Sequence, residues 1–406
     1  MLIKENHAWG QALSFMLVFS SIFGVKVGYL DFSILLPFLI LVFCVAIRHA
    51  LRFNKGFLVV AALIGILLAY QIAIQLQHSE FDINSLLRLA RSIIICILFS
   101  ALIASDIFSS RQVIHAVFYS LLVHAILVDA AAIFDPLNYF LSAISENDRV
   151  RPMRASGLLA GFDITGLLCL VGLLMVLLGV VKLKTIWTTV LICAIFILGC
   201  FFTSRVSMAF ALVFVFVFGA SNLLKSRLSA TSKFLFALVA AALSFYLVRE
   251  YVAPIVEVTF SLGALEIDSE QRDQISSRHA TQAADSFLWS RMFYLPADYL
   301  NTIFGTGVEE LYTDVGYVKD IFRYGILGML FSMFIYLYLF MVGRQGLRRT
   351  SNDSLYMLLK VVFLLILILT LKNNYFFTRA VFPLTLLIVC ASLMSKNEST
   401  AARPRV

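Results

Sequence analysis

Long stretches of apolar residues dominate this chain of 406 residues and constrain its fold more than any other feature. A helix needs about 20 largely apolar residues to cross the hydrocarbon core of a bilayer. Twelve stretches approach that length, and Asp, Glu, Lys and Arg make up only 14% of the chain, about half the share that is typical of a soluble domain. A soluble protein could not bury so much apolar surface. The sequence therefore predicts an all-α, polytopic integral membrane protein.

The predicted spans follow one another without a linker or a low-complexity segment, so we expect residues 1–406 to form a single membrane domain. As one helix, the run from 186 to 220 would be about 52 Å long at about 1.5 Å per residue, too long for one crossing. We therefore expect it to break at Thr203-Ser204-Arg205. The twelve spans are expected at 9–25, 30–47, 57–76, 90–105, 113–134, 157–181, 186–203, 206–220, 234–250, 321–343, 355–371 and 376–394.

The segments between the spans fall into two sets of unequal charge. The basic set holds 16 Lys or Arg and four Asp or Glu, the other set holds 15 and 20, and Lys360 lies within a span. Short basic loops stay in the cytoplasm, so we predict that both termini are cytoplasmic. The net charge of +8 therefore reflects the basic loops that orient the protein in the membrane, and nucleic acid is not an expected partner. The basic set comprises both termini and the loops at 48–56, 106–112, 182–185, 221–233 and 344–354.

Two loops of the outer face are long enough to carry function. The first covers residues 135–156, and the second covers residues 251–320, whose polar and acidic middle can form an amphipathic helix. The chain contains no GxxxxGK[ST], HExxH or paired CxxC motif. The sequence therefore predicts neither a metal site nor a cofactor, and nothing in it indicates nucleotide hydrolysis.

Arginine is concentrated on the predicted outer face, where it supplies 12 of the 15 cations. Several of these arginines lie at or inside the ends of spans, where a charged side chain is costly without a partner. The planar donor fork of Arg matches phosphate oxygens, so arginines that converge on one cavity would suit a pyrophosphate. The alternative is that they snorkel or pair with acids such as Asp163, Asp320 or Glu250. The candidates are Arg151, Arg154, Arg205, Arg291, Arg323 and Arg379.

The segment 301–328 holds a second group of candidate residues. Gly305 and Gly307 permit a tight turn, and the acids Glu309 and Asp314 follow it. A carboxylate at this place could take a proton from a sugar hydroxyl as a general base. The alternative is a solvated loop with an interfacial tyrosine, Tyr317.

Four motifs lie at the ends of the predicted spans and in the second outer loop. They are Arg154-Ala-Ser-Gly157; Thr203-Ser-Arg-Val-Ser207; Arg291 before Gly305-Thr-Gly307; and Asp314-Val-Gly-Tyr317 before Arg323-Tyr-Gly325. In this order and placement they resemble the motifs R-x-x-G, (T/G)SR(S/T), R…(G)xG and D-x-x-Y…G of the Wzy-type O-antigen polymerases, which belong to the O-antigen ligase and polymerase superfamily. The segment from Tyr312 to Gly325 lacks the histidine that the ligases tend to carry there, which favours a polymerase over a ligase.

The resemblance implies a metal-independent glycosyltransferase in the bacterial inner membrane, with an active site that faces the periplasm. Its substrate would be an oligosaccharide repeat unit on undecaprenyl pyrophosphate, and membrane lipid, a flippase and a chain-length regulator would be its partners. Arg205 would be catalytic, and Asp314 or Glu309 would be the base. Substrate binding would fall to Arg151, Arg154, Arg291, Tyr317, Arg323 and Arg379.

Three other functions stay open at this point. An O-antigen ligase would transfer finished polymer to the lipid A core, and a related polymerase would build capsule or exopolysaccharide. A flippase or exporter would not be an enzyme and would need a coupling pathway through the membrane. Only a few ionic residues are candidates for such a pathway, among them His124, Asp129 and Lys360, and they form no obvious relay in the sequence.

Overall fold

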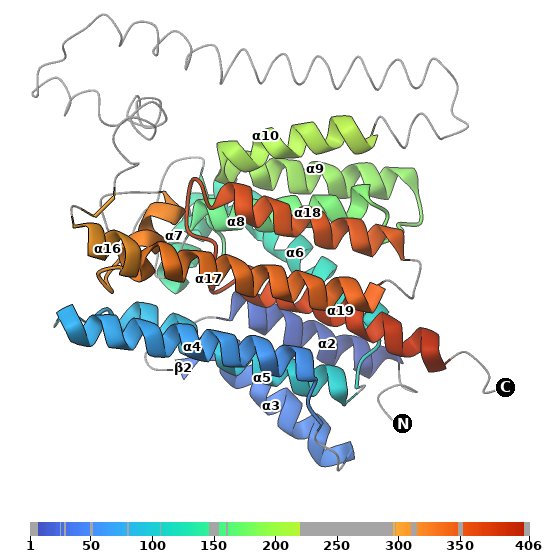
Figure 1. The fold of residues 1–406 in the computed structure, drawn as a ribbon. Helices are drawn as coiled ribbons and strands as arrows, with labels where there is room; N and C mark the ends of the chain where they lie inside the picture. Colours follow the sequence, from blue (N-terminus) through green and yellow to red (C-terminus); the bar gives the residue numbers. More distant parts are fainter. Residues whose placement is uncertain are drawn as a thin grey trace, which may run out of the picture.

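Helices make up most of the residues that a computed structural model of the protein describes (Figure 1). Among the described residues, five helices are long and apolar enough to cross a membrane, so the protein is a helical membrane protein. They are α4 (Lys55–His78), α5 (Ile83–Ala104), α6 (Ser110–Ile133), α9 (Ile186–Thr203) and α17 (Gly316–Leu347). The structure describes residues 7–24, 26–27, 30–48, 52–78, 81–105, 107–145, 154–159, 161–219, 295–296, 298–309, 315–347 and 352–401.

Shorter elements complete the bundle. Eleven of the twelve predicted spans coincide with a helix, while the span predicted at 234–250 lies outside the described residues. The number of membrane crossings therefore stays a prediction. The shorter elements are α2 (His7–Phe23), β1 (Lys26–Val27), β2 (Leu30–Asp31), α3 (Phe32–Arg48), α7 (Asp135–Ile144), α8 (Phe162–Leu177), α10 (Arg205–Phe214) with the π-helix η1 (Val215–Gly219), α16 (Tyr299–Phe304), α18 (Asp353–Leu369) and α19 (Val381–Ala401); β1 and β2 pair antiparallel.

The predicted break in the run from 186 to 220 is confirmed. α9 ends at Thr203, α10 begins at Arg205, and Ser204 between them has extended backbone angles of φ −137° and ψ 123°. Several predicted boundaries differ from the structure: α5 begins before its expected start at 90, and α8 and α19 begin after their expected starts at 157 and 376. α7 occupies much of the loop predicted at 135–156, and α17 begins at Gly316, before the expected start at 321. α17 starts early because Lys319 and Asp320, which the prediction left in a loop, have partners inside the protein.

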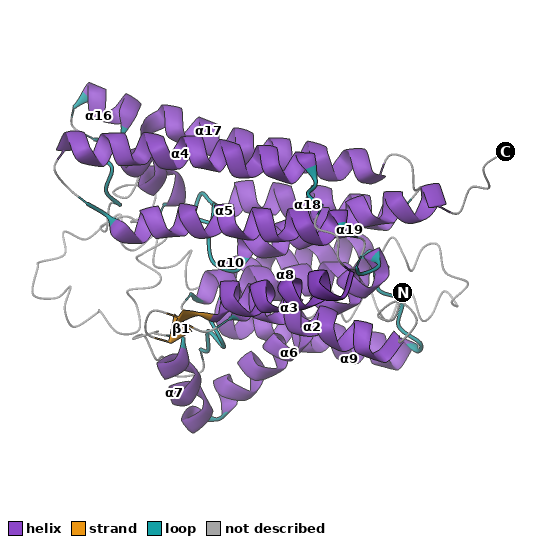
Figure 2. Ribbon diagram, turned by 90° about the horizontal axis from the view of Figure 1, so that it is seen from below, coloured by secondary structure: helices purple, strands orange, loops and turns teal. Residues whose placement is uncertain are grey.

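The core of the bundle lies around α8 and α19. Every residue of α8 from Thr165 to Val176 is buried, and almost all of α19 from Val381 to Met394 is buried too. α8 packs against α6, α9 and α10, and α19 packs against α5, α6, α17 and α18. Figure 2 shows these helices side by side, with their axes along roughly one direction. The bundle therefore has two ends at which the chain reverses.

The two ends of the bundle hold different loops. α2 begins and α19 ends at one end, which also holds the turns after α3, α5, α8 and α17 (Figure 1). All the described loops of the predicted basic set are at this end. The opposite end, here named the site end, holds the β1–β2 hairpin, α7, α16, the α9–α10 break and the loop of residues 370–380 (Figures 1 and 2). The described loops of the predicted basic set and those of the other set therefore lie at opposite ends of the bundle.

A break inside α17 shapes the site end. Gly325 has φ 66° and ψ 177°, and Gly305 has φ 89°. A side chain on Gly305 would overlap the backbone of Gly325, and a side chain on Gly325 would overlap the backbone of Ile303 and Phe304. Glycine tolerates these angles and the close approach. The carbonyl of Phe322 accepts hydrogen bonds from the backbone N–H and the hydroxyl of Thr306. Backbone groups freed by a break thus regain partners, as an apolar environment demands.

Candidate functional site

Three polar clusters lie at the site end, and the loop of residues 370–380 between α18 and α19 contacts all three. Lys372 lies 3.5 Å from Asp163 on α8. Asn374 donates a hydrogen bond to Asp320 on α17. Arg379 pairs with Asp31 on β2. One short segment therefore joins residues from distant parts of the sequence.

The first cluster surrounds Asp31. Arg379 donates to the carbonyl of Gly24 and to the Asp31 carboxylate, 3.0 Å away, and Arg91 lies 3.9 Å from the same carboxylate. Burial alone would raise the pKa of Asp31, but hydrogen bonds from Ser33 and the charges of Arg91 and Arg379 together hold it below its ordinary value. Arg379, a predicted substrate ligand, therefore takes part in an internal ion pair.

The second cluster is named here after Glu309. It contains Arg323, whose side chain is only 1% exposed. The guanidinium of Arg323 hydrogen-bonds Glu309 and lies 3.7 Å from Asp320, which is equally buried. Arg323 is thus paired within the protein, which is the alternative that the sequence left open for each arginine. The Glu309 cluster comprises Arg88, Glu309, Lys319, Asp320, Arg323 and Asn374.

Glu309 itself has three cationic neighbours. Besides Arg323, Arg88 lies 3.7 Å and Lys319 lies 3.5 Å from its carboxylate oxygens. The Glu309 carboxylate therefore takes part in ion pairs within the protein. Tyr317, the predicted sugar ligand, donates its hydroxyl to the carbonyl of Leu367 at 2.6 Å. That hydroxyl fastens α17 to α18.

The third cluster lies at the first turn of α8 and at the α9–α10 break. Ser204 is buried and donates its hydroxyl to Asp163 at 2.6 Å. Lys372 reaches the same carboxylate oxygen from the 370–380 loop. Arg205 follows Ser204 directly as the first residue of α10. The bond between Ser204 and Asp163 therefore fixes the place at which the Arg205 side chain leaves the backbone.

The Arg154 segment meets this cluster at the same turn of α8. The guanidinium carbon of Arg154 lies 5.6 Å from the centroid of the Phe162 ring, and Phe162 precedes Asp163 in the chain. The hydroxyl of Thr165 donates to the carbonyl of Ser156 at 2.8 Å and holds the segment against α8. The structure thus brings two predicted motifs to one place. We name Arg154, Phe162, Asp163, Ser204, Arg205 and Lys372 the Asp163 cluster.

The electrostatics of the Asp163 cluster favour an anion. It contains three cations and one carboxylate, and both α8 and α10 begin there. A helix N-terminus presents unpaired N–H groups and a partial positive charge. Within the part of the chain that the structure describes, the partly exposed guanidinium of Arg205 makes no hydrogen bond or ion pair. Arg205 is therefore available to a phosphate oxygen.

Some predicted site residues lie beyond the described chain. Arg151, Arg291 and Asp314 are outside it, as is the loop predicted at 251–320 before residue 295. Conversely, sequence reasoning gave no role to Lys372 or Arg88. Lys372 directly follows a predicted span at 355–371, and that position is the only sequence signal for it. In the described residues no three His, Cys, Asp or Glu side chains are grouped so as to hold a metal ion.

Comparison with known proteins adds no relative: no protein-family model matches the chain, and no curated protein sequence matches it. The resemblance to polysaccharide polymerases therefore rests on the four motifs and their placement. Function has to be argued from the residues at the site end.

Proposed function

We propose that this protein is a Wzy-type O-antigen polymerase, a membrane glycosyltransferase that joins undecaprenyl-pyrophosphate-linked repeat units at the outer face of the bacterial inner membrane. One observation carries the proposal. Arg205 has no protein partner among the described residues, and it begins α10 beside the Asp163–Lys372 pair at the start of α8. A free donor fork at two helix N-termini suits a pyrophosphate.

The proposed topology has twelve crossings and two cytoplasmic termini. Its support is that the described basic loops gather at one end of the bundle and the three polar clusters at the other. The active site then faces the periplasm, where no nucleotide supplies energy. Undecaprenyl pyrophosphate, membrane lipid, a flippase and a chain-length regulator are the proposed partners.

The proposed reaction is a glycosyl transfer. A hydroxyl oxygen of the incoming repeat unit attacks the anomeric carbon of the growing chain. The bond from that carbon to the pyrophosphate oxygen breaks, and undecaprenyl pyrophosphate leaves with the bonding electrons. Arg205 stabilises the charge that develops on the leaving group. The hydroxyl proton passes to a carboxylate, for which Asp314 and Glu309 are proposed.

The substitution Arg205→Lys tests the proposal, because it keeps the charge and removes the planar fork. We expect the yield of polymer to fall by a factor on the order of 100 or more. The measurement is the ladder of polymer lengths on a gel, at an equal protein level by immunoblot. Arg111→Lys, an exposed arginine at the other end of the bundle, is the matched control and should leave the ladder unchanged. An unaltered ladder from Arg205→Lys would contradict a catalytic role for Arg205.

Two further measurements separate the polymerase from its alternatives. A strain without a polymerase attaches single repeat units to its lipid A core, whereas a strain without a ligase leaves the core bare. A flippase or exporter, unlike a polymerase, does not lengthen lipid-linked repeats after purification in detergent. Bare core in the deletion strain, or no lengthening by the purified protein, would count against a polymerase.

A further inference from the structure

The short helix α7, which follows α6 at the site end, has a reversed distribution of polarity. Its buried side chains include Asn138 and Ser142, whereas Tyr139 and Phe140 are 63% and 61% exposed. A helix on a water-facing surface shows the opposite arrangement, with its apolar face toward the core. The outer face of α7 therefore suits a hydrocarbon environment better than water. We name the exposed apolar residues Ile133, Phe134, Tyr139 and Phe140 the α6–α7 edge.

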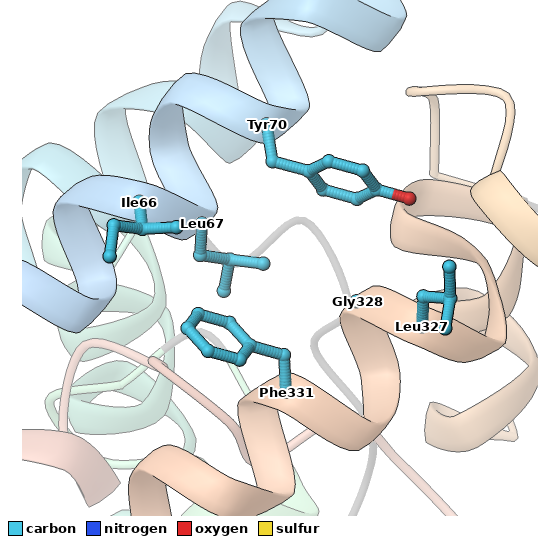
Figure 3. A pocket seen from close by; sticks show the side chains of 6 residues that line it. All are labelled: Ile66, Leu67, Tyr70, Leu327, Gly328 and Phe331. Carbon is cyan, nitrogen blue, oxygen red and sulfur yellow. The ribbon is translucent and has the colours of Figure 1, made fainter.

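The same reversal marks the lateral surface of the long helices. In the apolar pocket between α4 and α17, the hydroxyl of Tyr70 is the one polar side-chain atom among the lining residues (Figure 3). That hydroxyl donates to the carbonyls of Phe304 at 2.9 Å and Tyr324 at 3.2 Å, while Ile66 and Leu327 beside it are exposed. Both α4 and α17 are long enough to cross a membrane. Polar atoms turned inward and hydrocarbon turned outward thus characterise the surface that meets lipid.

An exposed apolar stripe on α6 leads into the α6–α7 edge. Tyr119, Val123, Ile126 and Ile133 are all exposed, and their spacings of four, three and seven residues place them on one face of the helix. α6 is long enough to cross a membrane, so lipid covers this stripe. The stripe ends at the α6–α7 edge, and the covering lipid therefore continues to α7.

The length of α6 places the α6–α7 edge near the boundary of the hydrocarbon core. α6 has 24 residues and is about 36 Å long at about 1.5 Å per residue. The hydrocarbon core is about 30 Å thick, so the ends of α6 lie close to its boundaries. α7 begins at Asp135, two residues after the end of α6, and Figure 2 shows it running across the direction of the long helices. A helix in the plane of a membrane interface has this orientation.

α7 also contacts the segment that carries Arg154. The side-chain amide of Asn138 donates to the carbonyl of Arg154 at 3.0 Å. Leu141 belongs to a small buried cluster that includes Ala155, the next residue of that segment, and Phe202 near the end of α9. The depth of α7 in the membrane therefore also sets the depth of the Arg154 backbone.

We propose that the α6–α7 edge is a lipid-binding surface, and that α7 lies in the membrane interface at the site end with Tyr139 and Phe140 among the upper acyl chains. The continuity of the edge with the lipid-covered stripe of α6 identifies lipid as its occupant. A tyrosine suits this depth, since its ring is apolar and its hydroxyl stays near water. The exposed Asp135 in the first turn of α7 stays in the hydrated headgroup region. The proposal does not rest on the proposed glycosyl transfer.

Depth-dependent quenching of tryptophan fluorescence tests the proposal on the full-length chain. Trp9, Trp187 and Trp289 are changed to Phe, and Phe140→Trp then places the only tryptophan in the α6–α7 edge. The protein is reconstituted in phosphatidylcholine vesicles whose acyl chains carry bromine, a contact quencher, either near the headgroup or near the chain end. An interfacial helix is buried about 5–10 Å into the boundary between headgroups and acyl chains, so shallow bromine should quench at least about twofold more strongly than deep bromine.

Val123→Trp in the same background is the matched control. Val123 is exposed on the same stripe of α6, ten residues before Ile133 and therefore about 15 Å from the end of the helix. The middle of the hydrocarbon core lies about 15 Å from its boundary, so deep bromine should quench this reporter more strongly than shallow bromine. Phe134→Trp, at the turn between α6 and α7, is a second reporter of the edge if Phe140→Trp fails to fold.

Three results would overturn the proposal. Stronger quenching of the edge reporter by deep bromine would place α7 inside the hydrocarbon core. Quenching by iodide in the water phase, without quenching by bromine, would place α7 in water. Protection from both quenchers would show that protein, such as a second copy of the chain, covers the edge. None of these results depends on sugar transfer, so a failure here is distinguishable from a failure of the proposed polymerase.

Discussion

Arg323 and Arg205 are both arginines near the start of an apolar helix at the site end, yet the structure treats them differently. Arg323 is fully buried and paired with Glu309 and Asp320, whereas Arg205 is partly exposed and has no partner among the described residues. The difference comes from the acids within reach. Asp320 lies one turn before Arg323 on the same helix, while Asp163, near Arg205, is already engaged by Ser204 and Lys372. Local competition for carboxylates thus separates a structural arginine from an available one.

The largest expected difference in stability is that between Arg323→Gln and Arg205→Gln, which remove the two guanidinium groups separately. Arg323→Gln leaves Asp320 buried beside one fewer cation and should lower the free energy of unfolding by about 3–5 kcal/mol. Arg205→Gln removes no described contact and should change it by less than about 0.5 kcal/mol. The measurement is unfolding of the purified protein in mixed micelles with increasing sodium dodecyl sulfate. Equal losses in the two variants would show that Arg205 is also structural.

A smaller effect is expected for two serines at the start of α10. Ser204→Ala removes a donor from the charged Asp163 carboxylate and should cost about 1.5–3 kcal/mol of stability. Ser207→Ala is the matched control, since the Ser207 hydroxyl is buried without a hydrogen bond to any described residue and its loss should be neutral or stabilising. The same unfolding measurement applies. If Ser207→Ala costs as much stability as Ser204→Ala, the hydrogen bond between Ser204 and Asp163 makes no special contribution. The account in which that bond positions Arg205 would then be contradicted.

The smallest effect concerns the response to acid of the first cluster, around Asp31. The folded protein holds the pKa of Asp31 below its ordinary value of 3.8, so the charged carboxylate contributes stability above that pH. This contribution is lost as the pH falls below 3.8 and through the lowered pKa. Asp31→Asn should therefore be less stable than the unaltered protein at neutral pH, and the difference should shrink in acid. A difference in thermal unfolding that stays constant down to pH 3 would contradict this account.

Much of the fold could be predicted from the apolar runs alone. A run of about 20 apolar residues has to be a helix in a membrane, because no other local structure satisfies its backbone. The same argument of length located the break at Ser204. It failed at the start of α17, where Lys319 and Asp320 lie inside a helix. Charges end an apolar run in the sequence, but tertiary partners allow the helix to continue through them.

The candidate site was predictable in part. The Arg154 and Arg205 motifs were recognised separately, and the structure brings both to the first turn of α8. Lys372 was missed because its partner Asp163 is more than 200 residues away in the chain, and no periodicity reports such a contact. The sequence likewise offered internal pairing as an alternative for every arginine. Only the positions of Asp31 and Glu309 in space assign that pairing to Arg379 and Arg323.

The 370–380 loop also dictates the order in which the site end is assembled. Chains are made from the N-terminus, at about 5–20 residues per second. Asp163 and Asp320 are therefore synthesised well before Lys372 and Asn374, their partners in the last helical hairpin. Until α18 and α19 enter the membrane, the site end lacks these partners and presents incompletely paired carboxylates. A nascent chain truncated before residue 370 therefore lacks the contacts that Lys372 and Asn374 make with these two carboxylates.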